Sequence, residues 1–139
     1  MKFYIGIISV LLFFTACKKE TTSSVILNEN PDTSAIIKFS GNFINGPYGT
    51  VSGKAKIVLQ NSQYKLQLDS FMTTNGPDLK VYLSQEIQPI NFVNLGSLKS
   101  TNGVQLYNIP SGVEFTQYKY ALIHCQQYNH LFGSAALKP

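Results

Sequence analysis

Hydrophobic and polar residues alternate with a period of two along most of residues 36–139, and turn residues interrupt the alternation at short intervals. This pattern is typical of short β-strands joined by tight turns. Residues 53–71 give the clearest case, because a two-residue turn at Asn61-Ser62 would pair Ile57 with Leu66 and put the apolar residues of both strands on one face. The segment predicts a β-hairpin.

No stretch between the predicted strands has the period of an amphipathic helix, so crossover connections are not expected and the sheet should be mainly antiparallel. We therefore expect an all-β fold, a single antiparallel β-sandwich, with a partly open barrel as the alternative. Five further strands are predicted at residues 39–44, 79–84, 104–109, 119–125 and 131–137.

The N-terminus has the features of an export signal. Lys2 precedes an apolar run over residues 3–14, and the small residues Thr15 and Ala16 follow it directly before Cys17. The run is shorter than the roughly 20 residues that span a bilayer core, so it predicts a signal peptide over residues 1–16. The segment resembles the lipobox of bacterial lipoproteins, in which the cysteine is acylated with fatty acids such as palmitate, although Phe14 replaces the usual Leu. Cys17 is therefore predicted to anchor the mature protein to a membrane.

Residues 17–35 are polar and rich in turn-forming residues, so we expect a lipidated N-terminus and a flexible tether before a domain formed by residues 36–139. The anchor predicts a location in the cell envelope, on the periplasmic face of a membrane or on the cell surface. The full chain has a net charge of +4, and its basic residues are scattered lysines without any arginine. Nucleic acid is therefore not an expected partner.

Motifs of common enzymes are absent from the sequence. It contains no G-x-S-x-G, no H-E-x-x-H, no phosphate-binding glycine loop and no C-x-x-C-H for covalent haem. The 7 acidic residues are spread along the chain, and no pair is placed as general acid and base. We therefore do not expect a catalyst.

The reactive side chains gather near the C-terminus, where His124, Cys125 and His130 lie within seven residues. If Cys17 is acylated, Cys125 has no cysteine partner and is a candidate redox thiol. A two-residue turn at Gln127-Tyr128 would pair Cys125 with His130 on one face, whereas a three-residue connection would pair His124 with His130 as a two-point metal site. The sequence does not choose between these registers.

The sequence by itself requires no cofactor. Thiolate, imidazole and thioether are the soft or borderline ligands that the domain offers. Bound haem or copper would therefore have to use Cys125, His124, His130 or Met72.

From about residue 41 to residue 137 the chain resembles the DM-thirteen family, the Skeletor-type domain that is also found beside DOMON domains. The landmarks are Gly53 with the strand after it, Asp69-Ser70-Phe71, Gly76-Pro77-Asp78-Leu79 before Val81-Tyr82-Leu83-Ser84, Leu95-Gly96 with Leu98-Lys99, Gly103 with Tyr107-Asn108-Ile109-Pro110, Ile123 to Cys125, Phe132-Gly133 and Ala135-Ala136-Leu137.

The resemblance implies a β domain that takes part in electron transfer. The family's characteristic cysteine corresponds to Cys125, which is proposed to act as a redox centre or to help hold a prosthetic group. His124 departs from the family pattern, which has an aromatic residue there, commonly Trp. We therefore expect a redox accessory of the envelope that exchanges electrons with another envelope redox protein through Cys125.

The alternative is a non-catalytic binding or scaffold module, in which Cys125 merely packs. Its distinguishing feature would be a surface patch of tyrosines. The candidates for that patch are Tyr48, Tyr82, Tyr107, Tyr118, Tyr120 and Tyr128.

Overall fold

The computed structural model describes residues 21–139; the predicted signal peptide and Cys17 lie outside the described residues. Residues 21–139 contain nine strands and no helix, which confirms the all-β prediction. The strands are β1 (Leu27–Asn28), β2 (Ile36–Asn45), β3 (Val51–Gln60), β4 (Gln63–Thr73), β5 (Leu79–Ser84), β6 (Phe92–Ser97), β7 (Asn102–Asn108), β8 (Tyr120–Cys125) and β9 (His130–Ala136). In this part of the chain no helix is long and apolar enough to cross a membrane.

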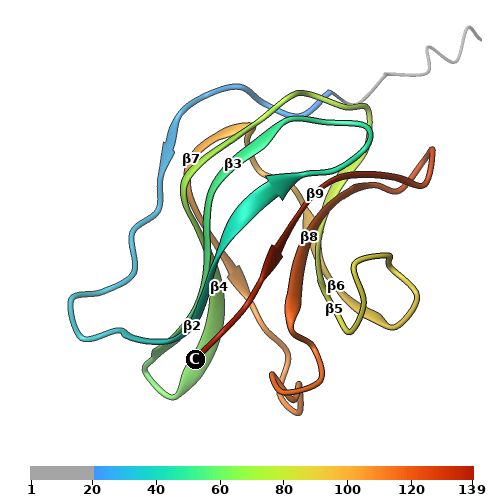
Figure 1. Ribbon diagram of the computed structural model, residues 1–139. Helices are drawn as coiled ribbons and strands as arrows, with labels where there is room; N and C mark the ends of the chain where they lie inside the picture. Colours follow the sequence, from blue (N-terminus) through green and yellow to red (C-terminus); the bar gives the residue numbers. More distant parts are fainter. Residues whose placement is uncertain (1–20) are drawn as a thin grey trace, which may run out of the picture.

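All nine strands belong to one sheet in the order β1-β7-β4-β3-β2-β9-β8-β5-β6, which curls into a partly open barrel (Figure 1). The sheet stays continuous because β2 pairs with β3 over its first part and with β9 from Phe43 to Asn45. The predicted β-sandwich is therefore replaced by its alternative, the partly open barrel, because β2 joins the two halves into one sheet. All neighbours are antiparallel except β1 and β7, which run parallel.

The β3–β4 hairpin has the predicted register, with Ile57 opposite Leu66. Asn61 and Ser62 form its turn with positive φ angles of 49° and 60°. Turns with two left-handed residues match the twist of the flanking strands. The inward side chains of this hairpin pack against those of β5, β8 and β9 in one hydrophobic core between the two halves of the sheet.

An N-terminal strap, defined as residues 22–29, is hydrogen-bonded along β7. Thr101 N–H donates to the carbonyl oxygen of Ser23 at 2.8 Å, and Glu29 N–H donates to that of Val104 at 2.9 Å. The Glu29 carboxylate also accepts hydrogen bonds from the Lys99 ammonium and the Leu106 N–H. The strap lies inside the range assigned to the tether, yet its backbone is held against the domain.

Three connections meet at one end of the barrel, here called the loop end: residues 46–50, 74–78 and 126–129. In Figure 1 this end is at the top, where the chain also enters the described part, whereas the C-terminus lies at the bottom. Hydrogen bonds join the loops, because Thr74 N–H donates to Thr50 O and Gln126 N–H donates to Asp78 O, each at 3.0 Å. The candidate redox residues lie at this end.

Candidate functional site

The turn between β8 and β9 fixes the register of the candidate residues. Cys125 is paired with His130, and His124 is paired with Leu131. Asn129 takes a positive φ of 53°, which Asn tolerates better than most residues, and so supplies the left-handed position that closes the turn. Of the two registers open from sequence, the structure has the one with the cysteine opposite His130.

Cys125 is a free cysteine that is 1% exposed. It points into the main core with Ala121 and Ile123 of the same strand, and its partner on β5 is Leu79. In the described part of the chain no hydrogen bond joins its thiol to the His130 ring. The thiol is therefore shielded from solvent and packed among apolar side chains, and His130 is its cross-strand partner on β9.

His124 points to the opposite face of β8, in contact with a small second cluster that contains Tyr82 and Leu122. It is 2% exposed, and its Nε2 lies 2.9 Å from Oδ1 of Asn129. Because an amide oxygen only accepts, Nε2 carries the proton and Nδ1 is left as an acceptor. Nδ1 is buried without a hydrogen-bond partner. Burial lowers the pKa of His124, as does the nearby His130, against the opposing effect of the Asn129 hydrogen bond.

His130 is half-buried and belongs to an aromatic cluster with Tyr48 and Tyr128. The Tyr48 ring stacks on it with a centroid separation of 3.6 Å and an interplanar angle of 1°. Tyr48 and Tyr128 are 55% and 56% exposed, so the cluster forms an aromatic surface beside the buried thiol. Tyr82 and Tyr107 of the predicted tyrosine patch are buried instead.

Met72 does not join the other candidate ligands. It is exposed on β4, where its neighbours in the sheet are Ser52 of β3 and Asn102 of β7. Cys125 points into the core and His124 points away from it, so these two predicted haem or copper ligands do not converge. Among residues 21–139 no group of three or more His, Cys, Asp or Glu side chains could hold a metal ion. These residues therefore do not fit a haem or copper centre built from protein ligands alone.

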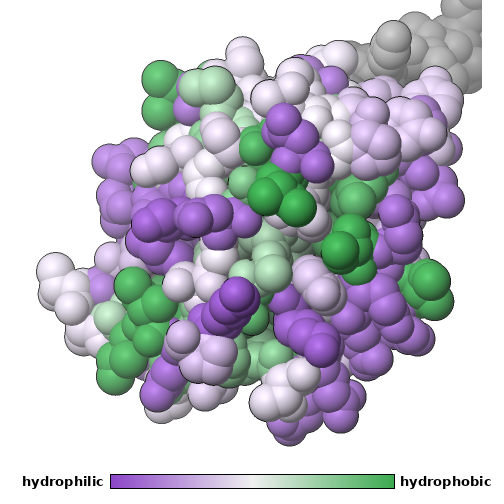
Figure 2. Space-filling view, viewed as in Figure 1, coloured by the Kyte–Doolittle hydropathy of each residue, from purple (hydrophilic) through white to green (hydrophobic). Residues whose placement is uncertain are grey.

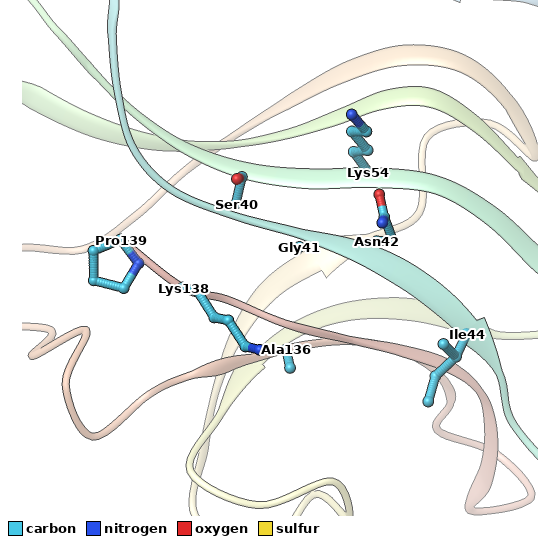
Figure 3. A pocket seen from close by; sticks show the side chains of 8 residues that line it. All are labelled: Ser40, Gly41, Asn42, Ile44, Lys54, Ala136, Lys138 and Pro139. Carbon is cyan, nitrogen blue, oxygen red and sulfur yellow. The ribbon is translucent and has the colours of Figure 1, made fainter.

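The surface pocket shown in Figure 3 has a volume of about 470 Å³ and lies over β2, β3 and the C-terminal residues. Its lining contains no thiol and no imidazole. The lining residues are Ser40, Gly41, Asn42, Ile44, Lys54, Ala136, Lys138 and Pro139. This pocket is separate from the Cys125 region, and its polar groups for binding are backbone, hydroxyl, amide and lysine groups.

Sequence reasoning missed Asn129, and it named Tyr48 and Tyr82 only as candidates for a tyrosine patch, without connecting them to the histidines. Asn129 orients His124, Tyr48 covers His130, and Tyr82 lies 5.6 Å from the His124 ring between centroids. The asparagine before His130 is a recognised left-handed turn residue and could have indicated the register. Tyr48 comes from a distant loop, so no local pattern connects it to His130.

Comparisons with curated proteins and with solved structures give no match. A family model described as "Electron transfer DM13" matches residues 42–137, which is more than half of the chain. The matched region begins within β2 and includes β9, so it contains the curled sheet and Cys125. The chain belongs to the DM13 electron-transfer family.

Proposed function

We propose that this protein is an electron-transfer accessory of the cell envelope, anchored by a lipid on Cys17 and using Cys125 as its redox group. Family membership supports the electron-transfer role. The observation that carries the proposal is the free thiol of Cys125, which is buried at the loop end and paired with the half-exposed His130. A redox group in this position is close to the surface but protected from bulk solvent.

The burial of Cys125 favours electron transfer over disulfide exchange. Exchange requires a thiolate to attack in line with the second sulfur, which needs open access to the thiol. Electron transfer to an oxidised metal centre of an envelope redox protein needs no such contact. In that step the thiol gives one electron to the oxidised metal centre, the S–H bond breaks, and the sulfur of Cys125 is left as a thiyl radical while the proton is released to solvent at the loop end.

Voltammetry of the protein purified from its native envelope tests the role of Cys125. We expect a one-electron couple that Cys125→Ser removes and His130→Gln shifts. Met72→Leu is the matched control, because Met72 is exposed on another strand, and it should leave the couple unchanged. Absence of a couple in the wild-type protein, or its survival in Cys125→Ser, would overturn the proposal.

A thiol probe separates electron transfer from disulfide exchange. Because Cys125 is 1% exposed, we expect slow labelling of the folded protein near neutral pH and rapid labelling after unfolding. Rapid labelling of the folded protein would contradict the shielded thiol and favour exchange. An absorbance spectrum of the same preparation tests for a bound group, which Cys125→Ser should remove if the thiol holds it.

The lipid anchor is tested separately with Cys17→Ser. Removing the acylated cysteine should release a soluble or unprocessed form, which detergent-phase partitioning and mass spectrometry detect. A Cys17→Ser protein that stays in the detergent phase at the mature mass would show that the N-terminus is not a lipidation site.

The exposed aromatic cluster favours a second candidate function, a binding module for envelope glycan. Stacked aromatic rings with exposed faces are common anchors of binding surfaces. Tyr48→Ala should then abolish co-sedimentation with isolated cell-wall glycan, while Ile44→Ala, another exposed residue, should not. Equal sedimentation of both variants and the wild type would contradict this function.

A further inference from the structure

The strap is hydrogen-bonded to the domain from its first residue, Thr22. Asn75 Nδ2, in the loop end, donates a hydrogen bond to the carbonyl oxygen of Thr22 at 3.0 Å, and Thr101 N–H binds the next carbonyl. The Ser100 hydroxyl then donates to the carbonyl oxygen of Val25. These bonds precede β1, so the chain is attached to the domain from Thr22 onward.

Only residues 18–21 separate Thr22 from Cys17. A chain reaches at most about 3.6 Å per residue, so the Cα atoms of Thr22 and Cys17 can be no more than about 18 Å apart. A domain of about 100 residues has a radius of gyration of about 13 Å. Its breadth is at least twice that radius, so the reach of the connection is shorter than the breadth of the domain. The end of the barrel that holds Thr22 must therefore stay near any lipid on Cys17.

We propose that the loop end of the barrel rests on the lipid headgroup surface, so that the Cys125 site faces the membrane. This inference rests on the proposed lipid anchor at Cys17. Asn75 connects the strap to residues 74–78, and those residues are hydrogen-bonded both to the β2–β3 loop and to the β8–β9 turn. The N-terminal entry and the Cys125 turn consequently share one end of the molecule (Figure 1).

The surface chemistry of this end suits lipid headgroups. Val25 and Ile26, which follow the attachment point, are 66% and 71% exposed. Tyr48 and Tyr128 project from the loops, and tyrosine is enriched where hydrocarbon meets water. The one charged residue of the three loops, Asp78, pairs with Lys80 at 3.0 Å. The loop end can therefore approach a membrane without stripping water from an unpaired charge.

Hydrophobic side chains on the face drawn in Figure 2 form small separate groups among polar ones. Such scattered groups are normal for a protein surface and do not favour insertion of the barrel wall into lipid. Contact through the loop end, directed by the short connection to Cys17, is consistent with this surface. An electron partner of Cys125 would then be carried in or on the same membrane.

Fluorescence quenching in phosphatidylcholine vesicles tests the orientation of the full lipidated protein. A fluorophore is attached to Gln127→Cys in the loop end or to Ser111→Cys in the β7–β8 connection, which lies at the opposite end. Both native residues are exposed, and labelled wild-type protein gives the background from Cys125. With a quencher placed at the headgroups, we expect quenching at position 127 several-fold stronger than at position 111.

Equal quenching at the two positions, or stronger quenching at position 111, in protein that floats with the vesicles would overturn the orientation while leaving the anchor intact. Protein that fails to float would overturn the anchor and the orientation together. A Gly/Ser insertion of about a dozen residues between Glu20 and Thr21 should reduce the contrast, because it lengthens the connection without touching the domain. A contrast that the insertion leaves unchanged would overturn the argument from chain length.

Discussion

Two buried polar regions of this domain differ in how well their hydrogen-bonding groups are satisfied. Beneath the strap, the Gln105 side chain accepts from the Tyr107 hydroxyl and the Ser100 N–H and donates to the Ser100 carbonyl oxygen. At the loop end, His124 has one partner and leaves Nδ1 without any. A satisfied network stabilises a fold, whereas an unsatisfied buried group lowers stability and is expected at functional sites.

Removing Gln105 should give the largest loss. Gln105→Leu leaves the Ser100 backbone groups and the Tyr107 hydroxyl without their partner in the core, so we expect a loss of about 2 to 4 kcal/mol in the free energy of unfolding. Urea denaturation measures it. Tyr107→Phe is the control and should cost less, about 1 to 2 kcal/mol, because it removes the acceptor of the Lys99 N–H but leaves the bonds between Gln105 and Ser100. Equal losses would show that the network does not act through Gln105.

At His124 the comparison predicts that a substitution leaves the free energy of unfolding unchanged or raises it. His124→Phe removes the unsatisfied Nδ1 and keeps an aromatic ring at this position. Asn129 is exposed, so its amide can bind water instead. We expect stability to stay the same or to rise by about 1 kcal/mol. A loss as large as that of Gln105→Leu would show that the imidazole is part of a satisfied structural network.

The acid sensitivity of the wild-type protein should come in part from His124. Because burial lowers its folded pKa below the ordinary value of 6.5, the unfolded chain takes up the proton first. The contribution of His124 to stability is complete above about pH 6.5 and is lost as the pH falls from there through the folded pKa. Thermal unfolding of wild type and His124→Phe as a function of pH should diverge in that window. Parallel curves would contradict a buried neutral imidazole.

The smallest effect is expected at the strap surface. Burial alone would raise the pKa of Glu29, but the hydrogen bonds from Lys99 and Leu106 outweigh it and lower the pKa. Glu29→Gln should cost about 0.5 kcal/mol, and less at high salt, because the ion pair with Lys99 is partly exposed. Hydrogen exchange of the Leu106 N–H should become faster. Unchanged exchange would show that the carboxylate does not hold the strap.

The sequence predicted the strands that pair with a neighbouring strand on each side better than the strands at the edges of the sheet. The β3–β4 hairpin has a strong alternation and a recognisable turn, so its register followed directly. β1 and β6 were not predicted, because each pairs along one side only and neither needs a regular apolar face. The single curled sheet also depended on β2 changing partners at Phe43, which no local pattern indicates.

For the candidate site, the sequence identified Cys125, His124 and His130 but could not decide their register. The left-handed Asn129 and the bulge between Ile123 and His124 settle it, and both are properties of the folded turn. Local sequence also could not show that His124 would be buried, because the aromatic residue beside it, Tyr82, comes from another strand.

The parallel pairing of β1 with β7 has a consequence for how the protein can be handled. β1 covers the outer side of β7, and an uncovered strand edge is a template for pairing with another chain. A shortened protein that begins at Ile36, where the domain was placed from sequence, would expose the backbone groups of Gly103 and Val104. Such a protein should self-associate through β7, and size-exclusion chromatography would show it as oligomers. Preparations that keep the strap should stay monodisperse.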